Sequence, residues 1–305
     1  MHLKFNEAYK QYLIYIENRL KKQSKRDLKE KFENKILPYF KDYNIYDITE
    51  LDYMLWQNNI EKFDYSNNYK ENLHYLVSGF FNYCITYHGL QKNVAKIVGN
   101  FKMKNIKIKR DYYTFKEYKQ FVKCVDNIIY KTFFDFMYFT GTRPGEAMAL
   151  KFSDLDNNRI ISINKTISEH TINGIREIDT PKSFDSVRDI KLDKKLYNDL
   201  LNLKKIYKSN DNNLYIFGGI KPLAPTTINR YKKKACEKAN IRPIELRAFR
   251  RSHASLLNHL NVPVQMIKER LGHSNINITM KYYVQTYQEK EKRVIKTLNL
   301  LRLLF

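Results

Sequence analysis

Apolar residues recur at helical spacing along most of this 305-residue chain, and this pattern is the strongest constraint on its fold. Residues at i, i+3, i+4 and i+7 share one face of an α-helix, so each such run predicts a helix with one buried side. In the first hundred residues, four runs of this kind predict a small basic helical bundle. They are FNEAYKQYLIYIENRL (5–20), KRDLKEKFENKILPYF (25–40), ITELDYMLWQNNIEKF (48–63) and NYKENLHYLVSGFFNYCITY (68–87).

The second half predicts helices on both sides of a β-rich stretch. Thr114 and Glu117 have the spacing of a capping box, which marks a helix start. An apolar helix over 127–140 ends at Gly141, and Pro144 suits the first position of the next helix. Further helices are predicted over 194–207, 225–239, 245–260, 263–271 and 276–284, with an amphipathic stretch over 289–305.

Three β-like runs occupy 159–167, 174–180 and 187–192. The dipeptide Asn173-Gly174 is a strong hairpin signal between the first two runs. The segment TPKSFDS joins the second and third runs, so Lys182 projects from a tight loop. We therefore expect a mainly α-helical protein with a small antiparallel β-sheet, in which a helical domain precedes an α+β domain.

A basic stretch without helical period separates the two halves. It predicts an extended linker over 101–113, between a helical domain at 1–100 and a second domain at 114–305. Either a solvated loop or a DNA contact explains such a linker. Its basic residues are Lys102, Lys104, Lys107, Lys109 and Arg110.

The charge balance favours an anionic partner. Lys and Arg total 55 against 32 Asp and Glu, a net charge of +23. Such an excess attracts polyanions, and nucleic acid is the first candidate. A membrane surface is the competing interpretation, but no segment approaches the roughly 20 apolar residues of a spanning helix. The N-terminus also lacks the apolar core of a signal peptide, so we expect a cytoplasmic protein associated with the nucleoid.

The stretch ELRAFRRSHASLL brings Arg247, Arg250 and Arg251 within five positions. The spacing i, i+3, i+4 puts them on one helical face, where their charges repel one another. A bound anion would relieve this repulsion, although a solvated helix face has the same composition.

Four segments, taken in order, resemble the signature of the tyrosine recombinases, the phage-integrase family. They are TGTRPGEAMALKFSD, TPKSFDSVR, RAFRRSHASLL and LGHSNINITMKYY, and the resemblance covers roughly 114–290. The helical region and the basic linker are similar to that family's core-binding domain. This resemblance implies a two-domain, C-shaped clamp around DNA.

The resemblance also implies a catalytic set. Arg143 matches the family's first catalytic arginine, with Glu146 as the acidic residue of the same helix. Lys182 matches the β-hairpin lysine, Arg250 the second arginine, and His273 the histidine of the LGH box. The always-protonated arginines suit the charge that grows on a phosphodiester during cleavage.

Tyr282, nine residues past His273, falls where the family has its nucleophile, and we expect Tyr283 to be a packing residue. The resemblance implies a 3′-phosphotyrosyl intermediate and a free 5′-hydroxyl, with Lys182 as the general acid for the leaving oxygen. The covalent link stores the energy of the broken bond, so neither a metal nor ATP nor any other cofactor is expected.

One departure concerns Arg247, which stands where the family usually has histidine. Arginine does not give up its proton near neutral pH, so it cannot act as a base. Either an active enzyme with this variant pocket or a decayed protein that only binds DNA is compatible with the sequence. His253 points to another helical face and is expected to be a core residue.

The partners follow from the resemblance. It implies a specific recombination site on double-stranded DNA, a homotetramer, and accessory DNA-bending or directionality proteins. The apolar C-terminal ending suits docking on a neighbouring subunit, or packing on its own domain. We expect the chain to begin at the core-binding region, without a separate arm-binding domain. The rival functions are a type IB-like DNA-relaxing enzyme and a sequence-specific DNA-binding protein with a decayed site.

Overall fold

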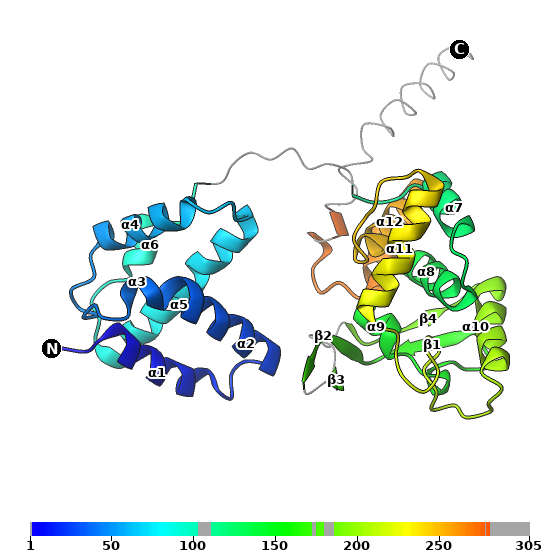
Figure 1. Ribbon diagram of the computed structural model, residues 1–305, viewed down its shortest axis with the longest axis horizontal. Helices are drawn as coiled ribbons and strands as arrows, with labels where there is room; N and C mark the ends of the chain where they lie inside the picture. The colour runs from blue at the N-terminus through cyan, green and yellow to red at the C-terminus, as the bar shows by residue number, and fades with distance from the viewer. Residues whose placement is uncertain (1, 103–110, 173–174, 180–185, 278, 281–305) are drawn as a thin grey trace, which may run out of the picture. The chain divides into compact units, whose positions relative to one another are not determined.

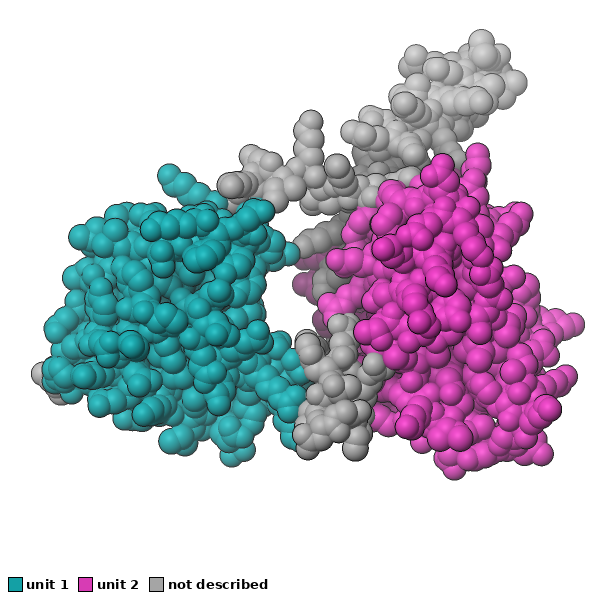
Figure 2. Space-filling model, in the orientation of Figure 1, with its two compact units in different colours: residues 1–108 teal, residues 109–305 magenta. Residues whose placement is uncertain are grey.

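The chain divides into two compact units, residues 1–108 and 109–305 (Figure 2). The structure is a computed structural model that describes residues 2–102, 111–172, 175–179, 186–277 and 279–280. Most of these residues are helical, and the strands are antiparallel, which confirms the predicted fold class. No helix in the described ranges combines the length and apolar character that crossing a membrane requires.

The first unit is a helical bundle around an aromatic core. Phe5, Phe32, Trp56, Phe80 and Phe81 are fully buried in it. The predicted helix over 25–40 contains a π-helical segment in which the Leu37 N–H bonds to the Phe32 carbonyl, five residues back. Pro38 follows directly and has no N–H to donate, which explains why the helix widens here. The helices are α1 (Phe5–Ile16), α2 (Lys22–Lys31), α3 (Leu37–Phe40), α4 (Glu50–Glu61), α5 (Asn67–His88) and α6 (Val94–Val98), with the π segment at Phe32–Ile36.

The second unit is built around α8 (Ile128–Thr140), which packs against α10 (Lys194–Ile206) and α12 (Ala248–His259) (Figure 1). The Phe133, Phe134 and Phe136 side chains of α8 are fully buried, as the predicted apolar helix requires. The other helices are α7 (Phe115–Lys123), α9 (Pro144–Ala149), α11 (Pro225–Ala239) and α13 (Val264–Leu271), with a 3-10 turn at Phe152–Asp154.

Among the described residues, the strands form two antiparallel pairs. Strand β1 (Ile160–Ile163) pairs with β4 (Arg188–Lys191), and β2 (Thr166–Ile172) pairs with β3 (Ile175–Asp179). The run predicted over 159–167 is therefore two strands. The break between them carries Lys165, whose Nζ donates to Asp154 Oδ1 at 2.7 Å. Pairing β1 with β4 brings Arg188 opposite Ile163. Strand β4 packs against α13, and the Arg188 side chain reaches Glu146 on α9.

Candidate active site

Arg143 lies in a tight turn between α8 and α9. Gly141 ends α8 with φ +69°, and a Cβ there would lie 2.6 Å from Leu271 Cδ2 and 2.7 Å from His253 Cδ2. Only glycine therefore fits the turn without strain. Arg143 is the N-cap of α9 and Pro144 its first residue, as the sequence predicts.

Glu146 holds the Arg143 guanidinium from the first turn of α9. The Arg143 N–H donates to Glu146 Oε2 at 2.9 Å, and Arg143 Nη1 donates to Glu146 Oε1 at 2.5 Å. Burial alone would raise the pKa of the Glu146 carboxyl, but the charges of Arg188 and Arg143 outweigh it and the pKa is lowered. Glu146 is thus a buried carboxylate that stays ionised at neutral pH.

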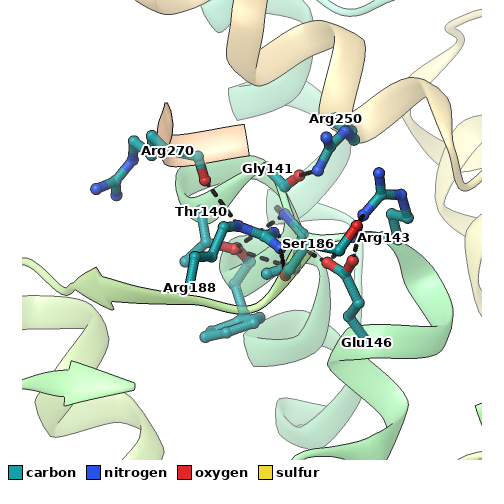
Figure 3. A network of polar contacts seen from close by, with 10 residues as sticks. Thr140, Gly141, Arg143, Glu146, Ser186, Arg188, Arg250 and Arg270 are labelled. Carbon is teal, nitrogen blue, oxygen red and sulfur yellow. Dashed lines mark hydrogen bonds and ion pairs between the residues drawn. The ribbon is translucent and has the colours of Figure 1, made fainter. Parts of the chain in front are cut away.

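Arg188 and Ser186 complete this network (Figure 3). Neither residue was predicted from the sequence to belong to the site. Arg188 Nη2 donates to Glu146 Oε2 at 2.9 Å, and Arg143 Nη1 donates to Ser186 Oγ at 3.3 Å. The sequence does carry a signal for Arg188. Arg188 lies two residues before the buried Ile190, so both side chains point to the same face of β4. A charged side chain is unusual on such a face unless it is paired.

The three arginines at 247–251 have three different environments. Arg250 is 8 % exposed, and its Nη1 donates to the Gly141 carbonyl at 2.9 Å. Arg247 precedes the first residue of α12 and is exposed, while Arg251 forms an ion pair with Asp111. Arg250 is labelled in the polar network of Figure 3.

His273 lies within the electrostatic influence of Arg143, Arg188 and Arg250. It follows the Gly272 C-cap of α13, is 7 % exposed, and its Nδ1 lies 2.8 Å from Thr279 Oγ1. Burial first, and then the charges of Arg250, Arg143 and Arg188, lower the pKa of His273 to about 3, against a smaller opposing effect of Glu146. The imidazole is therefore neutral near pH 7, and the positive charges that act on it come from three separate elements.

His253 is a core histidine, as predicted. It is 2 % exposed, its Nδ1 lies 2.9 Å from the Tyr138 carbonyl, and Arg270 Nε donates to its Nε2 at 3.2 Å. These partners assign the proton to Nδ1. Burial, followed by the charge of Arg270, lowers the pKa of His253 to about 3.

Several predicted site residues lie outside the described residues. Lys102 is described and exposed. Within the described part of the chain, no group of three or more His, Cys, Asp or Glu side chains is arranged to hold a metal ion. The predicted residues that are not described are Lys104, Lys107, Lys109, Arg110, Lys182, Tyr282 and Tyr283.

The charges of Arg143, Arg188 and Arg250 act together on His273, so this domain carries a cationic site whose chemistry suits an anion such as phosphate. Two family models identify its class: the phage integrase family matches residues 111–289, and the phage integrase N-terminal SAM-like domain matches residues 4–60. The chain belongs to the phage integrase family. It is a tyrosine-type site-specific recombinase, and neither a relaxing enzyme nor a decayed DNA-binding protein is favoured.

Individual relatives agree with this assignment. The ICEBs1 integrase of Bacillus subtilis (strain 168) is 28 % identical over 280 residues, which are 87 % of this chain and 74 % of that protein. The integrase of Staphylococcus phage L54a is 30 % identical over 170 residues, 51 % of this chain and 47 % of that protein.

Solved structures share the fold. The Tn1549 transposon integrase in complex with transposon right end DNA aligns with a TM-score of 0.77 at 18 % identity, over 94 % of this chain and 99 % of that one. A lambda integrase tetramer bound to a Holliday junction aligns with a TM-score of 0.65 at 17 % identity, over 90 % and 78 %.

Proposed function

We propose that Arg143, Lys182, Arg250, His273 and Tyr282 form the recombinase active site, with Arg247 in the place where the family usually has histidine. The observation that carries this proposal is the convergence of Arg143, Arg250 and His273. Arg250 on α12 donates to the carbonyl of Gly141, two residues before Arg143, and the charges of both arginines contribute to lowering the pKa of His273. A phosphate bound at that point would meet preorganised positive charge, which is usually the largest catalytic contribution.

The proposed reaction begins with attack of the Tyr282 oxygen on phosphorus. The new O–P bond leaves the DNA 3′-phosphate on the tyrosine, and the bond to the 5′ oxygen breaks as Lys182 donates a proton to that oxygen. Arg143 and Arg250 bind the non-bridging oxygens, where charge builds up. The reverse attack by a 5′-hydroxyl from the partner DNA restores the phosphodiester and releases the tyrosine.

Removal of the Tyr282 proton requires a base. A tyrosine hydroxyl with its usual pKa of about 10 is a poor nucleophile near neutral pH. Arg247 cannot accept the proton, and Glu146 is occupied by Arg143 and Arg188. Burial and the charges of Arg250, Arg143 and Arg188 lower the pKa of His273. A bound phosphate would counter those charges and make the neutral imidazole a stronger base, so we assign proton removal to His273, directly or through one water.

The two-domain arrangement supports a clamp on DNA. We propose that residues 1–100 bind the core DNA site, that the basic linker 101–113 contacts the backbone, and that 114–305 carry out the chemistry. Strand exchange between two sites requires a homotetramer, in which 289–305 dock on a neighbouring subunit. Accessory DNA-bending or directionality proteins would act on this assembly, at the nucleoid in the cytoplasm. The lambda integrase tetramer on a Holliday junction supports this arrangement by analogy of fold.

The test is covalent capture on nicked DNA. A pool of nicked duplexes is incubated with the protein, and adducts that survive denaturation are isolated and their DNA is sequenced. We expect an adduct with one preferred sequence, because the nick lets the free 5′ strand diffuse away and traps the intermediate. Tyr282→Phe should abolish it, and Tyr283→Phe is the matched control that should retain it.

Two results would contradict the proposal: no adduct from the wild-type protein, or an adduct that survives Tyr282→Phe. A second assay separates strand exchange from relaxation. We expect the protein to join two intact duplexes that carry the captured sequence into a recombinant product. A relaxing enzyme would instead remove supercoils from DNA as a monomer, without joining two sites.

A further inference from the structure

Arg188 is a buried cation that touches three separate parts of the catalytic unit. Its side chain is 7 % exposed. Nη2 donates to Glu146 Oε2, Nη1 to the Ser186 carbonyl and Nε to the Arg270 carbonyl, each at 2.9 Å. Every nitrogen of the guanidinium therefore donates to a protein acceptor, on three different segments of the unit.

We propose that Arg188 is a positioning residue that holds the Arg143 guanidinium and the His273 corner in one fixed arrangement before DNA binds. The inference rests on the proposed roles of Arg143 and His273. It goes beyond them because Arg188 lies outside the proposed catalytic set and acts through other residues.

The link to Arg143 has two branches. Glu146 uses Oε1 for Arg143 and Oε2 for Arg188, so the carboxylate is clamped between the two guanidiniums (Figure 3). Ser186 accepts from Arg188 with its carbonyl and from Arg143 with its hydroxyl. Because the acceptors of Arg143 are themselves held by Arg188, the direction of the Arg143 fork depends on a residue on β4.

The link to His273 passes through the end of α13. Arg188 Nε binds the carbonyl of Arg270, in the last turn of this helix. The helix ends at Leu271, and Gly272 (φ +67°) turns the chain into His273. Arg188 on β4 thus anchors the C-terminal end of α13. His273 lies two residues after the last residue of this helix, Leu271, so its position depends on this anchor.

Arg188 also keeps Glu146 ionised. The charged groups that act on Glu146 are Arg143 at the start of its own helix and Arg188 on β4. His273, a titratable group that is neutral near pH 7, follows α13, and Arg250 on α12 belongs to the same network. Burial is the largest influence on the Glu146 pKa and raises it, and the charge of Arg188 is the first that counteracts it. Without Arg188, Glu146 would take up a proton at a higher pH and would then hold Arg143 less firmly.

The experiment compares adduct formation in Arg188→Met, Arg188→Lys and a control, Arg242→Met, on the nicked duplex that the wild-type protein captures. Arg242 is a suitable control because it also joins a backbone carbonyl, that of Tyr112 at 2.5 Å, and a carboxylate, Glu117 at 3.7 Å, in the same unit. Single-turnover rates are measured from about pH 5 to pH 8, a range that covers a raised carboxyl pKa. Thermal unfolding identifies a temperature at which every variant is folded.

We expect Arg188→Met to slow adduct formation by about 100-fold, the effect of misplacing a catalytic group by about 1 Å. Its rate should fall further toward acid pH where the wild-type rate does not, and adding Glu146→Gln to Arg188→Met should remove this additional fall. Arg188→Lys keeps the charge and loses the fork, so its rate should be intermediate and its pH profile should match the wild type. Arg242→Met should retain the wild-type rate.

An Arg188→Met protein with the wild-type rate and pH profile would overturn the inference, as would an Arg188→Lys protein with the wild-type rate if the methionine variant does not fold. An equal loss in Arg242→Met would also overturn it, because the loss would then reflect the general cost of removing a hydrogen-bonded arginine from this unit. Failure of the proposed function looks different: the wild-type protein itself would then form no adduct.

Discussion

The two units treat buried charge in opposite ways. In the first unit, Lys70 is 4 % exposed and forms an ion pair with a single carboxylate, Glu61. In the second, Glu146 receives two guanidiniums, and Arg250 donates to a backbone carbonyl. The first arrangement pairs one cation with one anion, whereas in the second two guanidiniums share one carboxylate. The second arrangement therefore carries an excess of positive charge, which costs folding free energy and which an anionic substrate can neutralise.

The largest effect on the rate of adduct formation should come from removing one of the arginines of the second unit's site. Arg250→Met is expected to slow covalent adduct formation by about 10²- to 10³-fold, the usual loss for one charge-stabilising donor. Lys70→Met removes an equally buried cation from the balanced pair and should leave the rate on bound DNA unchanged. Single-turnover adduct formation with saturating protein checks both, and an equal loss in the two variants would contradict the contrast between the units.

Stability should respond in the opposite order. Glu146→Gln leaves Arg143 and Arg188 with no charged partner in their shared network, and we expect a loss of about 3 kcal/mol in the free energy of unfolding. Glu61→Gln should cost less, because Glu61 is 36 % exposed and the long Lys70 side chain can turn toward water. Urea unfolding of both variants measures this. A larger loss of unfolding free energy in Glu61→Gln than in Glu146→Gln would contradict the proposed difference between the two buried charge clusters.

The pH dependence of stability should come chiefly from the second unit. His253 and His273 have folded-state pKa values lowered to about 3, so the unfolded chain binds more protons below its own histidine pKa of about 6.5. Stability is then constant above that pH and falls as the pH drops from about 6.5 toward 3, by up to about 1.4 kcal/mol per pH unit for each histidine. The Glu146 contribution is lost only at lower pH, because its pKa is lowered too.

Urea unfolding at about pH 7.5 and pH 5.5 tests this, with His253→Asn as the variant. The asparagine N–H₂ can replace the bond from Nδ1 to the Tyr138 carbonyl, so the variant should fold and lose part of the slope. His74, in the first unit, also has a pKa lowered by burial, but Glu71 opposes the shift. His74→Asn should therefore change the slope less, and an equal or larger change there would contradict the comparison.

Local features of the site could be predicted from the sequence, and long-range ones could not. The Gly141–Pro144 turn and the position of Arg143 follow from capping rules that involve a few neighbouring residues. Arg188 reaches acceptors 42 and 82 residues away in the chain, at Glu146 and Arg270. No local pattern specifies such contacts, because they depend on how β4 docks against α9 and α13.

The same limit applies to the arginines of α12 and to the strands. Helical spacing put Arg251 beside Arg250, but it could not show that Asp111, from another segment, would pair with Arg251. Periodicity also joined β1 and β2 into one run, since both contain apolar and β-branched residues, whereas in the structure they pair with different strands and Lys165, between them, forms an ion pair with Asp154. Core helices were predictable because burial alone sets their pattern.

The smallest expected effect concerns Arg247, at the exposed start of α12 beside the charge excess. Arg247→His restores the residue type that the family usually has, and we expect adduct formation to stay the same or rise. A histidine at this position could share the work of proton removal, so the gain should be greatest near and above pH 6.5, the usual histidine pKa. If His273 is the base, Arg247→His should also partly restore a His273→Gln variant. Loss of activity in Arg247→His would instead give Arg247 a specific role, in which a permanent charge at the edge of the cluster is needed to hold DNA.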